Sequence, residues 1–71
     1  MELKDIQARL RAAIKQSGKM QKDIAKEIGV SPQTVSKYMK DDIYPALDTL
    51  AKLCVCIDAS ADYILGIDDD K

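Results

Sequence analysis

The apolar residues of the chain recur at steps of three and four, which is the spacing of one face of a helix. The first such stretch begins near the N-terminus and carries basic residues mainly on its opposite side. Its apolar positions are Leu3, Ile6, Leu10, Ala13 and Ile14. This pattern predicts an amphipathic helix that ends at Ser17-Gly18, because glycine adopts the left-handed conformation that terminates helices.

Two shorter amphipathic segments follow the first. One of them, residues 21–28, stops at Gly29. The other opens with Ser31-Pro32, a strong start signal, because serine caps free amide groups and proline needs no donor at the first helical position. The apolar faces consist of Ile24, Ala25 and Ile28 in one segment and of Val35, Tyr38 and Met39 in the other. The polar residues expected to project outward from the second segment are Gln33, Thr34, Ser36 and Lys37.

Two further helices complete the pattern, and no stretch of the sequence reads as a strand. After a break at Asp41-Asp42, Pro45 introduces a fourth helix, and Ser60 can cap a short fifth helix that Gly66 ends. The apolar positions are Leu47, Leu50, Leu53, Cys54 and Ile57 in the fourth and Tyr63, Ile64 and Leu65 in the fifth. The sequence therefore predicts an all-α fold, a compact domain of five helices.

Length and composition limit what this domain does. A chain of 71 residues makes one small domain, which we assign to residues 1–67, followed by an acidic tail at residues 68–71. The chain has no histidine, which removes the commonest general base and every Ser-His or Cys-His nucleophile pair. Its two cysteines, Cys54 and Cys56, are too close to form a useful disulfide and too few to bind zinc. We therefore expect no enzyme activity, no cofactor and no metal, and a location in the reducing cytoplasm.

The charges of the chain are unevenly distributed along it. Residues 1–40 hold nine lysines or arginines against four acidic residues, whereas residues 41–71 hold two against eight. A basic half suggests a polyanion as partner, although charged faces are more often simply solvated. The lysines at positions 15, 19, 22 and 26 can be interpreted either way.

The most informative stretch is QKDIAKEIGVSPQTVSKYMK, residues 21–40. Two short helices joined by a turn that contains glycine form a helix-turn-helix, whose second helix enters the major groove of DNA. Gly29 must be small because the turn requires a positive φ. Ala25 must be small because the second helix crosses close above it. The residues that fill the angle between the helices are Ile24, Ile28, Val30, Val35 and Tyr38.

With these residues the chain resembles the phage-repressor and Cro type of helix-turn-helix regulator, the XRE family. The resemblance covers nearly the whole chain, because the helix after Pro45 and the ending ADYILGI at residues 61–67 are similar to the last two helices of that family's domain. It implies a lambda-repressor-like five-helix domain that binds specific double-stranded DNA and regulates transcription, most simply as a repressor.

The resemblance also implies roles for individual residues. Gln21 matches a glutamine that bonds a DNA phosphate and braces the recognition helix. Gln33 and Lys37 match positions that touch base edges, where glutamine can bond adenine in two places and lysine can donate to guanine. Ser31 is a helix cap and a candidate phosphate ligand. The full set expected to contact DNA is Gln21, Ser31, Gln33, Thr34, Ser36, Lys37 and Lys40.

Three positions depart from the family pattern. Met20 stands where many relatives carry a threonine cap, so the helix that starts at residue 21 lacks that cap. Pro32 replaces a side chain that reads bases in some relatives. Asp41 and Asp42 occupy a loop where relatives usually have glycine and basic residues, and their carboxylates would repel a DNA backbone that they faced.

The expected partner is a double-stranded DNA operator, bound by a homodimer whose recognition helices lie about 34 Å apart. No membrane partner is expected, because the longest apolar run, residues 53–57, is too short to span a bilayer. The alternative is a protein-interaction module on the same fold, which would dock a protein partner through the acidic second half. The residues expected to contact that partner are Ile43, Tyr44 and Leu65.

Overall fold

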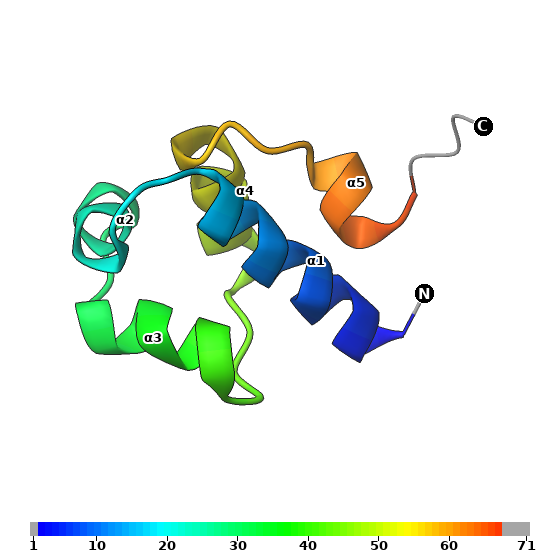
Figure 1. Ribbon diagram of the computed structural model, residues 1–71, viewed down its shortest axis with the longest axis horizontal. Helices are drawn as coiled ribbons and strands as arrows, with labels where there is room; N and C mark the ends of the chain where they lie inside the picture. The colour runs from blue at the N-terminus through cyan, green and yellow to red at the C-terminus, as the bar shows by residue number, and fades with distance from the viewer. Residues whose placement is uncertain (1, 68–71) are drawn as a thin grey trace.

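The computed structural model describes residues 2–67 and is built from five helices (Figure 1). In chain order they are α1 (Leu3–Gln16), α2 (Gln21–Ile28), α3 (Pro32–Lys40), α4 (Leu47–Cys56) and α5 (Ala61–Leu65). No strand occurs within residues 2–67, so the predicted all-α fold with five helices is confirmed. The acidic tail expected at residues 68–71 lies outside the described residues.

Helix α1 crosses the middle of the molecule in Figure 1. Helix α5 packs against α1, and α3 lies along the opposite edge, where it contacts both α1 and α2. Helix α4 packs against α2. This arrangement leaves one side of α3 facing outward, away from the other four helices.

All five helices contribute to one hydrophobic core. Four side chains, one each from α2, α3, α4 and α5, are completely inaccessible to solvent: Ile24, Val35, Leu53 and Ile64. The remaining core residues are Leu10, Ile14, Ala25, Ile28, Tyr38, Cys54 and Ile57. Cys54 therefore behaves as the small buried hydrophobe expected from its place on the apolar face of α4.

Local signals set most of the helix ends. The Ser31 hydroxyl accepts a hydrogen bond from the Thr34 amide at 3.2 Å, and Pro32 is the first residue of α3. Ser60 caps α5 in the same way through the Tyr63 amide, also at 3.2 Å. Both caps are the ones that the sequence predicts.

Three residues at predicted apolar positions are instead exposed, and one of them is Tyr63 of α5, whose exposed fraction is 45%. The exposed fraction of Leu47 is 85%, and that of Leu3 is 55%. Helix α4 begins at Leu47, two residues after Pro45, and burial increases from Leu47 through the half-buried Leu50 to Leu53. The exposure of Leu3 and of Leu47 has the same cause: the apolar stripe of each helix continues into a first turn that lies at the edge of the core.

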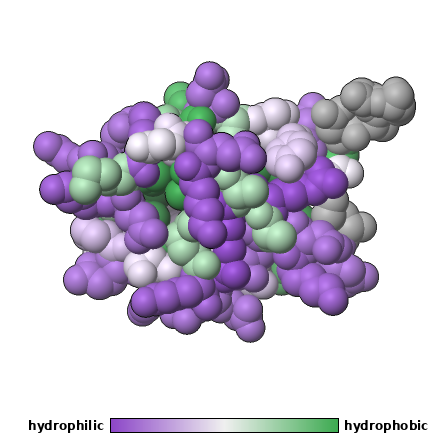
Figure 2. Space-filling view, in the orientation of Figure 1, coloured by the Kyte–Doolittle hydropathy of each residue, from purple (hydrophilic) through white to green (hydrophobic). Residues whose placement is uncertain are grey.

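Hydrophilic residues dominate the face of the molecule seen in Figure 2, where apolar groups form small patches. Of the described helices, none combines the length and the hydropathy that a bilayer crossing would require.

The turn between α2 and α3 depends on the backbone conformation of Gly29, whose φ of 81° lies in the left-handed region. A Cβ built at this position meets no heavy atom within 4 Å, so the backbone conformation alone disfavours a side chain. Gly29→Val should therefore lower the free energy of unfolding by about 1 to 3 kcal/mol.

Gly29→Asn is the matched variant, because asparagine tolerates positive φ far better than a β-branched residue does. Urea unfolding of both variants and the parent measures the effect. Equal stability of the valine and asparagine variants would contradict the assignment of the cost to φ.

Candidate nucleic-acid interface

Helices α2 and α3 pack against each other across the turn at Gly29. The amides of Gly29 and Val30 both donate to the carbonyl oxygen of Ala25, at 2.9 and 3.0 Å, and so close the end of α2. Ala25 itself is buried, and Ile24 and Val35 face the core from the two helices. The helix-turn-helix therefore lies where the sequence places it.

Helix α3 has an inner face that packs in the core and an outer face that is exposed to solvent. Val35 and Tyr38 are buried, and burial raises the pKa of the Tyr38 hydroxyl. Gln33 and Lys37 are both exposed, and their spacing of four residues puts them on one side of the helix. Lys40 is also exposed, at the C-terminal end. The outer face thus presents an amide and two ammonium groups to solvent.

The other predicted contact residues lie around this face with different exposure. Ser31 is exposed at the N-cap of α3, and Gln21 is exposed as the first residue of α2. Thr34 and Ser36 are half-buried, so they project outward less than the sequence suggested. The Thr34 hydroxyl lies 2.9 Å from the Ser31 hydroxyl, so these two residues share one polar cluster at the start of α3.

The start of α2 lacks a side-chain cap, as the methionine at position 20 predicts. Helix α2 nevertheless begins at Gln21, because the amides of Asp23 and Ile24 both donate to the Met20 carbonyl oxygen at 3.0 Å. Asp23 lies in the first turn, where a carboxylate interacts favourably with the helix dipole. These contacts hold Gln21 in a helical position.

Charge changes sign at the end of α3. The helix has no acidic residue in its first turn and carries Lys37 and Lys40 in its last turn. Asp41 and Asp42 follow directly and are both exposed. The acidic loop that departs from the family pattern therefore lies next to the two lysines of the outer face.

The sequence did not reveal two residues of α1 that hold the end of α3. The Gln7 side-chain amide donates to the Asp41 carbonyl oxygen at 2.8 Å. The Arg11 guanidinium donates to the same oxygen at 3.0 Å and to the Tyr38 carbonyl oxygen at 2.9 Å. We call this set of three bonds the α3 clamp. The only signal in the sequence is a polar pair four residues apart on α1, which does not identify a distant partner.

Lys19 is bound within the molecule. Its ammonium group donates to a Glu27 carboxylate oxygen at 3.1 Å and to the Cys56 carbonyl oxygen at 2.7 Å. The hydrogen bond with Glu27 raises the pKa of Lys19 and lowers that of Glu27. Lys19 thus links α2 to the end of α4. The lysines at positions 15, 22 and 26 are exposed.

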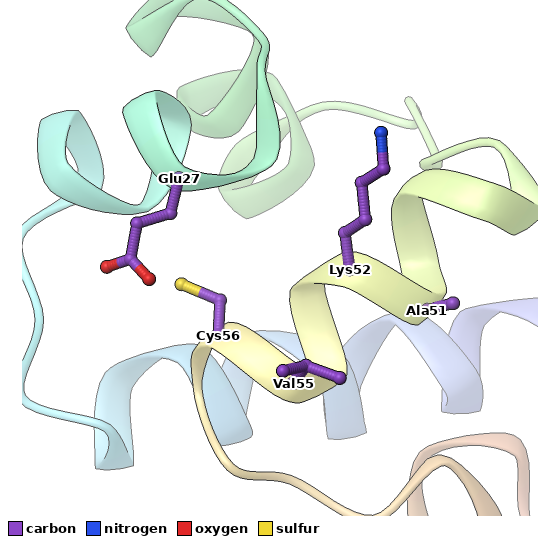
Figure 3. A pocket seen from close by; sticks show the side chains of 5 residues that line it. All are labelled: Glu27, Ala51, Lys52, Val55 and Cys56. Carbon is purple, nitrogen blue, oxygen red and sulfur yellow. The ribbon is translucent and has the colours of Figure 1, made fainter.

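Beside this link lies an open hollow of about 390 Å³ between α2 and α4, where Glu27 and Cys56 point toward one another (Figure 3). Burial raises the pKa of the Cys56 thiol. Cys54 and Cys56 are both free thiols. Within residues 2–67, no group of three potential metal ligands comes together.

The sequence of the chain is similar to those of known helix-turn-helix proteins. A family model described as helix-turn-helix matches residues 10–64, which include the whole α2–α3 unit. The HTH-type transcriptional regulator ImmR of Bacillus subtilis (strain 168) is 36% identical over 61 residues, which are 86% of this chain and 48% of the relative. The chain thus spans about half the length of this curated relative. No solved structure matches the chain.

Proposed function

The chain belongs to the XRE type of the helix-turn-helix family, and from this premise we propose that it binds specific double-stranded DNA and regulates transcription. The observation that carries the proposal is the outer face of α3. Gln33 and Lys37 are exposed there, while Val35 and Tyr38 anchor the inner face in the core. A helix held in this way presents polar side chains at a fixed angle to a groove.

In the proposed complex α3 enters the major groove. Gln33 makes two hydrogen bonds to an adenine, and Lys37 donates to a guanine. Gln21 and Ser31 contact phosphates, which position the domain without specifying a sequence. The residues that complete the contact surface are Thr34, Ser36 and Lys40.

We propose repression as the regulatory effect and a homodimer as the binding form. A domain that occupies its operator excludes other proteins from the same DNA and needs no further contact to repress. One α3 reads only a short half-site, and two copies related by a twofold axis would place their recognition helices about 34 Å apart, one turn of DNA.

A protein-interaction module remains the second candidate, and one observation favours it. Leu3, Leu47 and Ile43 are exposed apolar residues, Ile43 at 44%, and Leu3 and Leu47 are the first residues of α1 and α4. An apolar groove of about 140 Å³ there is lined by Leu3, Leu47 and Tyr44. The two other residues expected to dock a protein, Tyr44 and Leu65, are half-buried.

A salt titration separates the two candidates. Binding to random duplex DNA, followed by fluorescence anisotropy, should weaken as salt rises, with log affinity falling by about 0.9 per phosphate contacted for each unit of log salt. An interaction module without DNA affinity would show no such binding even at low salt.

Truncating the outer face of α3 tests base reading directly. Gln33→Ala and Lys37→Ala should each weaken binding to a site selected from a random duplex pool by about 1 to 3 kcal/mol, and each should relax preference at one base pair. Both side chains are exposed, so the free energy of unfolding should change by less than about 0.5 kcal/mol.

The measurement is the affinity of each variant for the selected site and for its single-base variants at one salt concentration. Lys15→Ala is a matched control, because Lys15 is an exposed lysine on α1, outside the proposed reading face. If Gln33→Ala and Lys37→Ala keep the parent's affinity and base preferences, α3 does not read DNA.

The acidic loop after α3 generates a separate prediction. Replacing Asp41 and Asp42 by asparagine removes two negative charges beside Lys40 and should strengthen binding to every duplex at low salt. Sequence preference should stay the same, because contacts with phosphate position the domain without specifying bases. Unchanged affinity at low salt would show that these carboxylates point away from the DNA backbone.

A further inference from the structure

Helix α3 ends without a cap of its own. Helix α2 terminates at a left-handed glycine, whereas the residue after α3, Asp41, is extended, with φ of −114° and ψ of 171°. The Asp41 amide bonds the Lys37 carbonyl oxygen at 2.8 Å, and the later carbonyls have no partner within α3 itself. The carbonyl oxygens of the last turn are therefore open to partners from outside α3.

The α3 clamp supplies that hold from α1. The planar guanidinium of Arg11 spans two carbonyl oxygens, those of Tyr38 and Asp41, and Gln7 adds a second bond to Asp41. A positive charge at a helix C-terminus also interacts favourably with the helix dipole. Three bonds thus join the middle of α1 to the end of α3.

We propose that Gln7 and Arg11 are positioning residues that set the angle at which α3 presents its outer face to DNA. The inference rests on the proposed function, because it concerns the same reading face. The turn at Gly29 and the cap at Ser31 hold the N-terminal end of α3, and the α3 clamp holds the C-terminal end.

Both residues act on the bases only through α3. The exposed fraction of Gln7 is 7%, and its side-chain amide is bonded to the Asp41 carbonyl oxygen, so it lies too deep to reach a phosphate. Two guanidinium nitrogens of Arg11, Nε and Nη2, are already bonded to α3 carbonyl oxygens.

The two reading residues depend unequally on the α3 clamp. Lys37 directly precedes Tyr38, whose carbonyl oxygen Arg11 bonds, whereas Gln33 lies in the first turn beside the Ser31 cap. Loss of the clamp should therefore displace Lys37 and leave Gln33 nearly in place. Loss of the α3 clamp should therefore weaken base preference at the base pair that Lys37 reads and leave preference at the other base pairs nearly unchanged.

The experiment compares Arg11→Met, Arg11→Lys and Gln7→Leu with Lys15→Met, an exposed cation on the same helix. The base pair read by Lys37 is the one at which Lys37→Ala relaxes preference. The readout is the ratio of affinities for the selected site and for its single-base variants, at a temperature where circular dichroism shows every variant to be folded.

Arg11→Met should lower discrimination at the Lys37 base pair roughly tenfold and change discrimination at the Gln33 base pair by less than about twofold. Arg11→Lys should not rescue it, because an ammonium keeps the charge but lacks the rigid fork that spans two carbonyls. Gln7→Leu should also lower discrimination at the Lys37 base pair, by less than Arg11→Met does, and should leave discrimination at the Gln33 base pair nearly unchanged. Lys15→Met should change neither ratio.

Two results would overturn the proposal. If Arg11→Lys restores full discrimination, the charge of Arg11 acts on DNA and its geometry does not matter. If Arg11→Met melts at a lower temperature but keeps both ratios, the α3 clamp only stabilises the fold.

If the parent protein shows no base preference, the proposed function is wrong. Amide hydrogen exchange of the free protein then tests the α3 clamp without DNA. Arg11→Met should speed exchange of the Asp41 amide and of the last turn of α3, while the first turn of α3 and the whole of α4 keep their protection. Equal acceleration along all of α3, or none, would overturn the positioning role.

Discussion

Burial of Val35 and Tyr38 in the common core is the constraint on which the rest of the molecule depends. Because a helix repeats every 3.6 residues, fixing two inner positions of α3 also fixes which side chains remain outside. The core that receives them is shared by all five helices, so no element can shift without disturbing this assignment. The single core of a small domain therefore determines both the fold and which side chains of α3 face solvent.

The elements that could be predicted from sequence are those whose signals are local. Gly29 ends α2 and Ser31 caps α3 because each acts on residues within a few positions of itself. The exposed placement of Gln33 and Lys37 follows from the same local periodicity. Exposure of Leu47 could not be predicted, because it depends on where the core ends in space.

The α3 clamp was beyond sequence reasoning for a different reason. Its bonds join residues 27 to 34 positions apart, and the acceptors are backbone carbonyls, which every residue possesses. No pattern of side chains identifies which carbonyl a given arginine will bond. Hydrogen bonds between a side chain and distant backbone become visible only when the chain is folded.

Counting charges along the sequence overstated the number of free cations. Arg9 donates to the Tyr63 carbonyl oxygen at 2.8 Å and lies 4.8 Å from the centre of the Tyr63 ring, and so joins α1 to α5. Arg11 and Lys19 are likewise bonded within the molecule. Part of the basic half therefore holds helices together, and on α3 the exposed positive charge comes from Lys37 and Lys40.

The division of α3 into a buried and an exposed side has a consequence for the evolution of such a domain. Gln33 and Lys37 contribute nothing to the core. A substitution at either position therefore changes a side chain on the outer face of α3, while Val35 and Tyr38 still hold the helix in the core. With the base contacts proposed for Gln33 and Lys37, duplicated genes with this architecture would diverge toward different targets through one or two substitutions, without first acquiring compensating changes in the interior. Selection can thus act on recognition and on folding through separate sets of residues.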